Sequence, residues 1–283
     1  MNILVTGSGG QLGSEIRKLS PGHNDNFIFT DVDDLDITDI EALDLYFKIT
    51  KLDIVINCAA YTAVDMAEKE AFLARRINSD SCANIAKLSK KYGFRIIHIS
   101  TDFVYNGRKN TPYVESDPTG PLSVYGRTKL EGEKHIMSAA GSYIIIRTSW
   151  LYSSFGKNFV KTMIKAAGEK PELRVVCDQT GTPTYAGDLA AAILKILPEF
   201  LPGTRQTYHY SNEGTASWYD FTVAICDLMG IKIPVKPISS SEYVSPARRP
   251  AYSVLSKEKI KKDFGLAVPY WRESLKACLE FMK

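Results

Sequence analysis

The sequence has no run of apolar residues that approaches the roughly 18 needed for a membrane-spanning helix. It has no CxxC pair, and its five cysteines are odd in number and widely spaced, which argues against a disulfide framework or a zinc site. The opening segment Met-Asn-Ile-Leu-Val leads into a glycine turn without the basic segment and cleavage site of a secretory signal. We therefore expect buried, reduced thiols in a cytoplasmic protein that does not bind membranes.

The sequence also lacks a cluster of basic residues. Its 35 basic and 32 acidic residues are scattered and give a net charge of +3, so binding to a nucleic-acid backbone is not expected. Internal repeats and low-complexity tracts are absent as well. What remains is an ordinary globular composition, 45% hydrophobic and 24% charged. A chain of 283 residues is long enough for one large domain or for a domain with a smaller lobe.

The first half alternates short runs rich in valine and isoleucine with longer amphipathic segments. This alternation is typical of parallel strands that are covered by helices on both faces. The expected strands are residues 2–6, 27–31, 53–58, 95–100 and 143–149. The expected helices are residues 11–19, 39–49, 66–92 and 124–137. The pattern predicts an α/β fold with a Rossmann-like, doubly wound parallel sheet.

After Trp150 the pattern becomes less regular. A helix at 157–167, a strand at 174–178 and a helix at 186–197 are expected to continue the sheet. They are followed by a short strand at 207–211, a helix at 217–229, a proline- and serine-rich connection at 235–250 and a last helix at 270–282. We therefore expect a sheet domain of residues 1–150 plus about 174–200, and a smaller, interrupted lobe of about 151–173 and 201–283.

A glycine-rich turn follows the first expected strand. Gly7, Gly10 and Gly13 stand in a G-x-x-G-x-x-G arrangement, with Gln11 and Leu12 opening the next helix. Glycines at these positions permit a tight turn, a close approach of the backbone to a pyrophosphate and close packing of the helix on the strand. The turn therefore predicts a dinucleotide site on the sheet domain and leaves the smaller lobe for a substrate.

Residues at the ends of the second and third strands fit the same interpretation. Asp31 lies about 20 residues beyond the turn, where a carboxylate accepts hydrogen bonds from the ribose and favours NAD. Asp36 and Ile37 are expected against the adenine, and Ala59 and Ala60 leave room for the cofactor. A simpler alternative stays open, in which the acid only caps a helix and the alanines only pack beneath one.

A tyrosine and a lysine share one face of the helix after the fourth strand. Tyr125 and Lys129 are four positions apart, and the preceding strand ends in hydroxyl side chains, Ser100 and Thr101. A ketone reduced by hydride needs a proton, and a nearby ammonium brings the pKa of a phenol toward the working range. We expect Tyr125 to supply the proton, Lys129 to assist it, and Thr101, rather than Ser100, to hold the carbonyl oxygen.

The chain resembles the extended short-chain dehydrogenase/reductase superfamily and, within it, the dTDP-4-dehydrorhamnose reductase family. The likeness extends over essentially all 283 residues. The tracts that carry it are Gly-Gln-Leu-Gly (10–13), Ala-Ala-Tyr-Thr-Ala-Val-Asp (59–65), Ser-Thr-Asp-Phe-Val-Tyr (100–105), Val-Tyr-Gly-Arg-Thr-Lys-Leu-Glu-Gly-Glu (124–133), Arg-Thr-Ser-Trp (147–150), Asp-Gln-Thr-Gly-Thr-Pro-Thr (178–184) and Arg-Arg-Pro (248–250).

The resemblance implies reduction of dTDP-4-dehydro-β-L-rhamnose to dTDP-L-rhamnose, a sugar donor for cell-surface polysaccharide. The expected cofactor-binding residues are Gly7, Gly10, Gln11, Leu12, Gly13, Asp31, Asp36, Ile37, Ala59, Ala60, Tyr61, Tyr125 and Lys129. The expected substrate-binding residues are Thr62, Thr101, Asp102, Tyr125 and Trp150. Trp150 has a plainer alternative, a core aromatic that caps the fifth strand.

The resemblance also bears on cofactor choice and assembly. The family accepts NADPH and often NADH, whereas Asp31 should repel a 2′-phosphate, so either cofactor remains possible. Some members form dimers around a magnesium ion held by glutamates, and Glu15 matches one such position. No glutamate matches after Thr184, where Tyr-Ala-Gly-Asp follows, so the ion is not favoured and the chain is expected to be a monomer or a homodimer.

Two other functions are compatible with the same scaffold. One is a nucleotide-sugar epimerase or dehydratase, but the dehydratases place an acid pair after the active-site threonine, and here Phe103 follows Asp102. The other is a non-catalytic subunit similar to the regulatory subunit of methionine adenosyltransferase. The presence of Tyr125, Lys129 and Thr101 favours the enzyme.

Overall fold

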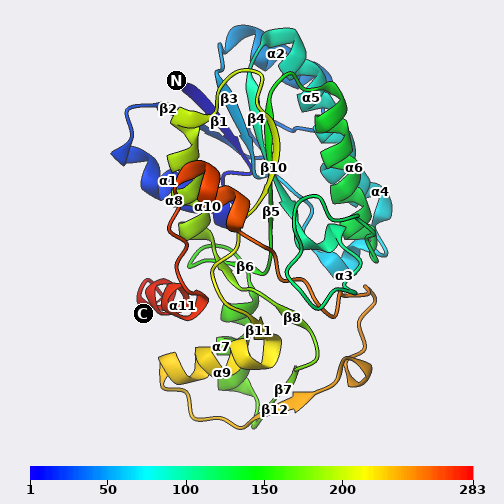
Figure 1. Ribbon diagram of the computed structural model, residues 1–283, viewed down its shortest axis with the longest axis vertical. Helices are drawn as coiled ribbons and strands as arrows, with labels where there is room; N and C mark the ends of the chain where they lie inside the picture. The colour runs from blue at the N-terminus through cyan, green and yellow to red at the C-terminus, as the bar shows by residue number, and fades with distance from the viewer. Residues whose placement is uncertain (283) are drawn as a thin grey trace.

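The computed structural model describes residues 1–282, and its centre is a six-stranded parallel sheet (Figure 1). The strands lie in the order β10-β5-β4-β3-β1-β2. Their bounds are β1 (Asn2–Thr6), β2 (Asn26–Thr30), β3 (Ile54–Asn57), β4 (Arg95–Thr101), β5 (Tyr143–Thr148) and β10 (Arg205–His209). Every residue of β3 and β5 is buried, as expected for strands covered on both faces. The predicted α/β fold is confirmed.

Helices cover both faces of this sheet (Figure 1). One face carries α1 (Gln11–Leu19), α8 (Ala186–Ile196) and α10 (Glu258–Phe264). The other face carries α2 (Ile40–Ile49), α5 (Ser81–Tyr92) and α6 (Val124–Ala139). Successive strand residues point to opposite faces of the sheet. Ile3 and Val5 therefore pack in the core beneath α1, α8 and α10, and Leu4 packs in the core beneath α2, α5 and α6.

The chain changes direction across the sheet next to β1. This strand pairs with β2 on one side, and β3 then returns to pair on its other side. Open parallel sheets bind ligands outside the carboxyl ends of the strands at such a switch point. The glycine turn after β1, the alanines after β3 and the hydroxyl residues at the end of β4 all lie at this edge.

A smaller lobe lies below the sheet in the view of Figure 1. Its helices are α7 (Phe159–Glu169), α9 (Trp218–Met229) and α11 (Trp271–Glu280). Its strands pair two by two: β6 (Leu151–Tyr152) with β9 (Thr184–Tyr185), β8 (Thr180–Gly181) with β11 (Ala216–Ser217), and β7 (Leu173–Val176) with β12 (Val235–Ile238). A separate hydrophobic core, which includes Tyr152, Phe221 and Trp271, holds the lobe together.

The structure corrects the predicted continuation of the sheet. Strand 174–178 was expected to extend it, but β7 pairs with β12 in the lobe. The strand predicted at 207–211 in the lobe is instead β10, which pairs with β5 at the sheet edge. Which strand pairs with which depends on the tertiary structure, and a short apolar segment in the sequence does not reveal its partner.

The predicted helix 66–92 is divided into several pieces. These are α3 (Val64–Ala67), α4 (Ala71–Arg75), a π-helical turn (Arg76–Asp80) and α5. Glu70, with φ −110° and ψ 42°, has left the helical conformation and separates α3 from α4. Asn78 in the π-helical turn donates to the carbonyl of Tyr61 at 3.1 Å and accepts from its N–H at 2.8 Å. The interruption therefore anchors the loop that follows β3.

All five cysteines are free thiols, and Cys82, Cys226 and Cys278 are buried as expected. Cys177 is exposed, so the expectation of burial is wrong for this residue, which follows β7 at the surface of the lobe. Within residues 1–282, no helix combines the length and the apolar character that a membrane crossing requires.

Candidate active site

A cavity of about 930 Å³ lies at the carboxyl edge of the sheet. The predicted site residues in its lining are Gly7, Gly10, Gln11, Leu12, Gly13, Asp31, Asp36, Ile37, Ala59, Ala60, Thr62, Thr101, Asp102, Tyr125, Lys129 and Trp150. They come from segments far apart in the chain, yet the fold brings them to one hollow. The glycine turn and the Tyr–Lys pair thus line the same cavity.

The glycine turn is as close-packed as its sequence predicts. Gly7 has φ +62°, and a Cβ there would lie 2.6 Å from the Cα of Ala59. A Cβ on Gly13 would lie 2.6 Å from the carbonyl oxygen of Gly7, so neither position accepts a side chain. Gly10 is the N-cap of α1 and places no side chain over the helix N-terminus. The first amide groups of α1 are therefore accessible to an anion.

Asp31 is tied to this turn. Its Oδ2 accepts from the N–H of Gly9 at 2.7 Å, and its Oδ1 accepts from the N–H of Val32 at 2.8 Å. The carboxylate is fixed beside the glycine turn, as a ribose-binding role requires. Asp36 accepts from both the N–H and the hydroxyl of Thr38 at 2.8 Å, so its carboxylate is already engaged locally.

Tyr125 stands in the first turn of α6. Ser123 caps this helix by accepting from the N–H of Gly126 at 3.2 Å, and the ring of Phe103 meets the Tyr125 ring edge to face at 5.5 Å. Desolvation raises the pKa of Tyr125 to about 12, while a hydrogen bond with Thr101 acts to lower it. The phenol is therefore protonated at neutral pH.

Lys129 lies one turn further along α6 and is buried. Its ammonium donates to the carbonyl oxygen of Ile99 at 2.6 Å, and burial lowers its pKa. In the protein alone, desolvation outweighs any effect of this ammonium on the pKa of Tyr125, which is raised rather than lowered. The assisting role of Lys129 stays a prediction for the cofactor-bound state.

The two hydroxyls at the end of β4 have different surroundings. Ser100 donates to Oε1 of Glu133 at 2.5 Å, which commits its hydroxyl to a structural contact. Thr101 donates to Oδ1 of Asp102 at 3.1 Å and contacts Tyr125. The structure thus favours Thr101 over Ser100 as the residue that meets a substrate oxygen.

Asp102 is a buried carboxylic acid in the cavity lining. It is only 2% exposed, and its Oδ2 has no hydrogen-bond partner among the residues that the structure describes. Desolvation raises the pKa of Asp102 to about 6. A buried oxygen without a partner is costly, so a polar ligand group is a natural partner for it.

Trp150 follows β5 in an unusual conformation. Its φ of 47° makes it the one non-glycine residue with positive φ in the described chain, at a cost of about 1–2 kcal/mol. Such strain persists only where the surroundings hold it. The indole lies on Gly181, where a Cβ would be 2.5 Å from Cε2 of Trp150, and it stacks on Trp218 with ring centroids 3.5 Å apart.

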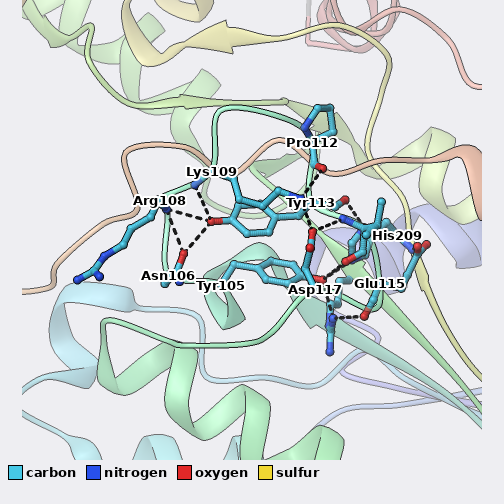
Figure 2. A network of polar contacts seen from close by, with 11 residues as sticks. Tyr105, Asn106, Arg108, Lys109, Pro112, Tyr113, Glu115, Asp117 and His209 are labelled. Atoms are coloured by element: carbon cyan, nitrogen blue, oxygen red, sulfur yellow. Dashed lines mark hydrogen bonds and ion pairs between the residues drawn. The ribbon is translucent and has the colours of Figure 1, made fainter.

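The segment between Asp102 and α6 is fixed by polar contacts (Figure 2). The hydroxyl of Tyr105 pairs with Nε2 of His209 at 2.8 Å, and Nδ1 of His209 pairs with the carbonyl of Tyr113 at 3.1 Å. Lys109 donates to Asp117 at 2.6 Å further along the segment. These contacts hold the chain that connects Thr101 to Tyr125.

Two predicted residues lie outside the cavity lining. The Tyr61 hydroxyl donates to Oε2 of Glu70 at 2.5 Å, so its side chain is committed elsewhere than the expected cofactor site. Glu15 is 1% exposed and accepts from Ser153 at 2.6 Å, which leaves it inside the fold. Within residues 1–282, no group of three or more His, Cys, Asp or Glu lies close enough together to hold a metal ion.

Several lining residues were not predicted. They are Arg76, Asn158, Phe159, Trp218 and Arg249 among others. Arg249 lies in the Arg-Arg-Pro tract, and its guanidinium binds Asp65, with Nη2 at 2.7 Å from Oδ2. The sequence around Trp218 and Phe159 gives no indication that they line a cavity, because an aromatic residue on an amphipathic helix is normally expected in the hydrophobic core.

Comparisons with known proteins identify the family of the chain. A family model described as RmlD substrate binding domain matches residues 1–283. A spore coat polysaccharide biosynthesis protein of Bacillus subtilis is 41% identical over 278 residues, covering 98% of this chain and 96% of that protein.

Two solved structures are similar throughout. The crystal structure of a dTDP-4-dehydrorhamnose reductase from Clostridium acetobutylicum has a TM-score of 0.95 at 44% identity, covering 100% of this chain and 99% of that one. The structure of dTDP-4-dehydrorhamnose reductase from Bacillus anthracis in complex with NADP has a TM-score of 0.94 at 38% identity, covering 99% and 98%. With the family model matching its full length, the chain belongs to the RmlD substrate binding domain family.

Proposed function

We propose that the protein reduces the 4-keto group of dTDP-4-dehydro-β-L-rhamnose to give dTDP-L-rhamnose, with NADPH or NADH as the reductant. The observation that carries the proposal is the meeting of Tyr125, Lys129 and Thr101 with the glycine turn in one cavity. The names of the relatives from Clostridium acetobutylicum and Bacillus anthracis support the substrate, and the NADP complex of the latter supports the cofactor.

The lining fits a dinucleotide. The uncovered N-terminus of α1 suits a pyrophosphate, because Gly7 and Gly13 let the backbone approach closely and Gly10 adds no side chain. Asp31, held by Gly9, suits ribose hydroxyls. A bound nicotinamide cofactor supplies the hydride that the carbonyl carbon accepts.

Tyr125 donates its proton to the keto oxygen as that oxygen gains negative charge. With a pKa of about 12 in the protein alone the phenol is protonated but is a weak acid, so its donation depends on stabilisation of the phenolate once the cofactor is bound. Thr101 holds the same oxygen by a hydrogen bond. Lys129, whose ammonium lies beneath the site on the Ile99 carbonyl, reduces the cost of the phenolate that remains.

The sugar lies between the end of β4 and the smaller lobe. We assign Thr62, Asp102 and Trp150 to substrate binding, because all three line the cavity with Tyr125. The carboxyl group of Asp102, which lines the cavity beside Thr101, suits a sugar hydroxyl. Trp150 adds apolar surface to this part of the lining.

The two parts of the chain divide the task. The sheet with its helices, including β10, is the dinucleotide-binding domain, and the lobe after Trp150, including β7, supplies the substrate side. This keeps the predicted two-part organisation and moves its boundaries to the observed strand pairing. We expect the protein to act in the cytoplasm as a monomer or a homodimer.

An assay that follows the absorbance of NADPH or NADH, which falls as the cofactor is oxidised, tests the proposal. The purified protein should oxidise at least one of them when dTDP-4-dehydro-β-L-rhamnose is supplied, with UDP- and GDP-linked 4-keto sugars as comparison substrates. Turnover only with the UDP- or GDP-linked sugars would contradict the assignment of dTDP. Failure to oxidise either cofactor with any of these sugars would contradict reduction and return attention to the non-catalytic alternative.

A further inference from the structure

Three aromatic side chains form one wall of the cavity. Trp150, Trp218 and Phe159 all line it, although they come from the end of β5, from α9 and from α7. Trp218 is the middle member: its ring lies 3.5 Å from that of Trp150 at an interplanar angle of 6°, and 4.6 Å from that of Phe159 at 48°. The wall therefore connects the sheet domain to the smaller lobe through Trp218.

The lobe fixes Trp218 independently of Trp150. Trp218 is the first residue of α9, next to a capping box in which Ser217 and Asp220 bind each other's backbone N–H groups. Its indole Nε1 donates to Oε1 of Gln179 at 3.2 Å, and Gln179 in turn donates to Ser240 at 3.0 Å. These contacts set the plane of the indole from within the lobe.

Trp150, in contrast, needs support from outside its own backbone. Its left-handed φ of 47° is unfavourable for a residue with a large side chain. The supports are the bare backbone of Gly181 beneath one part of the ring, the stacked face of Trp218, and a hydrogen bond from the N–H of Thr184 to its carbonyl at 3.2 Å. Trp218 is the side-chain support that covers a ring face.

We propose that Trp218 is a positioning residue for the sugar. It holds Trp150 in the strained conformation that bounds the space in front of Thr101 and Tyr125, and it thereby sets how tightly the sugar nucleotide is held. This inference rests on the proposed function. Because the cofactor residues lie on the other domain, loss of the Trp218 ring weakens sugar-nucleotide binding and leaves cofactor binding unchanged.

Circular dichroism reports the stack without any turnover. Two indoles in contact couple their electronic transitions, giving an exciton couplet whose size depends on the angle between the long axes of the rings, and the chain has three tryptophans. Trp218→Leu and Trp150→Leu should each abolish the couplet. Trp271→Phe is the matched control, because Trp271 is a buried tryptophan of the same lobe that lies outside the cavity lining and packs on Phe221 at 5.9 Å. The control should retain the couplet.

Kinetics then distinguish positioning from simple structural support. Trp218→Leu should raise KM for the dTDP-4-keto sugar by about tenfold, the fold-change expected from losing an aromatic pair, with KM for NADPH unchanged. In a protein that already carries Trp150→Leu, adding Trp218→Leu should raise KM little further, since Trp218 acts through Trp150. Trp218→Phe, which keeps an aromatic face, should give a smaller increase and serves if the leucine variant does not fold.

The outcomes separate cleanly. An active wild type whose KM for the sugar is unchanged in both Trp218→Leu and Trp218→Phe overturns the inference alone. Full, additive KM effects of the two tryptophan substitutions overturn it as well, because they show that Trp218 acts independently of Trp150. A wild type that reduces no dTDP-4-keto sugar overturns the proposed function and this inference together.

Discussion

Arg147 and Glu133 form a buried, two-point ion pair between β5 and α6. Nε of Arg147 donates to Oε1 of Glu133 at 2.9 Å, and Nη2 donates to Oε2 at 2.6 Å. Glu133 belongs to α6, the helix of Tyr125, and Arg147 belongs to β5. Because Ser100 also donates to Glu133, one carboxylate ties together β4, β5 and α6. The pair therefore fixes the elements that bring Thr101 to Tyr125.

Removing the charge of Glu133 should destabilise the protein strongly. Glu133→Gln leaves the Arg147 guanidinium buried without its counter-ion, and we expect the free energy of unfolding to fall by about 3–5 kcal/mol. Urea denaturation measures the loss. Glu169→Gln is the control, because it breaks an exposed pair with Lys165 and should cost no more than about 1 kcal/mol. Equal losses in the two variants would show that the buried pair does not anchor the site.

Replacing Tyr125 by phenylalanine should remove the proton donor and little else. We expect kcat to fall by about 10²- to 10⁴-fold, with the affinity for NADPH unchanged, since the ring still fills its place against Phe103. Absorbance at saturating substrate gives kcat, and quenching of protein fluorescence gives cofactor affinity. Tyr92→Phe is the matched control, because the Tyr92 hydroxyl donates to Oδ1 of Asp44 at 2.9 Å outside the cavity lining and its loss should not change kcat. Unchanged turnover in Tyr125→Phe would remove this phenol from the chemistry.

Asp102 should make the folded state less stable as the pH rises. Its pKa is raised from 3.8 to about 6 by burial, so between these values the folded state binds more protons than the unfolded state. The favourable contribution is complete below pH 3.8 and is lost as the pH rises through about 6, a total of about 3 kcal/mol. Urea denaturation of the wild type and of Asp102→Asn across this range measures it.

The test depends only on the difference in the free energy of unfolding between the wild type and Asp102→Asn. Asparagine does not titrate, so the stability of Asp102→Asn relative to the wild type should increase with pH over this interval and then level off. Other titrating groups, such as the buried His209, contribute equally to both proteins and cancel. A difference that stays constant with pH would mean that Asp102 is not buried in the folded protein as described.

The parts of the site that could be predicted from sequence are local. Tyr125 and Lys129 are one helical turn apart, and Gly7 to Gly13 form a single strand–turn–helix connection, so their spacing alone records the geometry. The fold class could be predicted for the same reason, because the residue pattern of each buried strand and each amphipathic helix lies within its own segment of the sequence. The prediction that Thr101 holds the carbonyl oxygen also depended on a local feature, its position at the end of a strand.

The parts that could not be predicted depend on contacts between distant segments. Trp218 meets Trp150 only because the lobe folds back over the sheet edge, and no periodicity distinguishes it from an ordinary core tryptophan. The pairing of β7 with β12 and of β10 with β5 is also a tertiary choice. The hydrogen bond of Tyr61 to Glu70 is a further contact that its position after a strand end does not reveal, and its cofactor-binding role stays a prediction.

Asp31 should set the balance between the two cofactors. Its carboxylate is fixed by the N–H groups of Gly9 and Val32 beside the site expected for the ribose, where it repels a 2′-phosphate. Asp31→Asn keeps an acceptor for Gly9 and removes the charge, so the ratio of kcat/KM for NADPH to that for NADH should rise about ten- to a hundredfold. Initial rates with each cofactor at fixed dTDP-4-keto sugar give the ratio.

Asp34→Asn is the matched control for this change. Asp34 is three residues away, accepts from the N–H of Asp31 at 3.0 Å and lies outside the cavity lining, so its charge should influence the ratio far less. An equal shift in both variants would point to the general negative potential of this acidic loop. No shift in Asp31→Asn would mean that the carboxylate does not face the ribose, and cofactor choice would then have to be sought in other groups of the lining, such as Arg76, which lies 3.7 Å from Asp36.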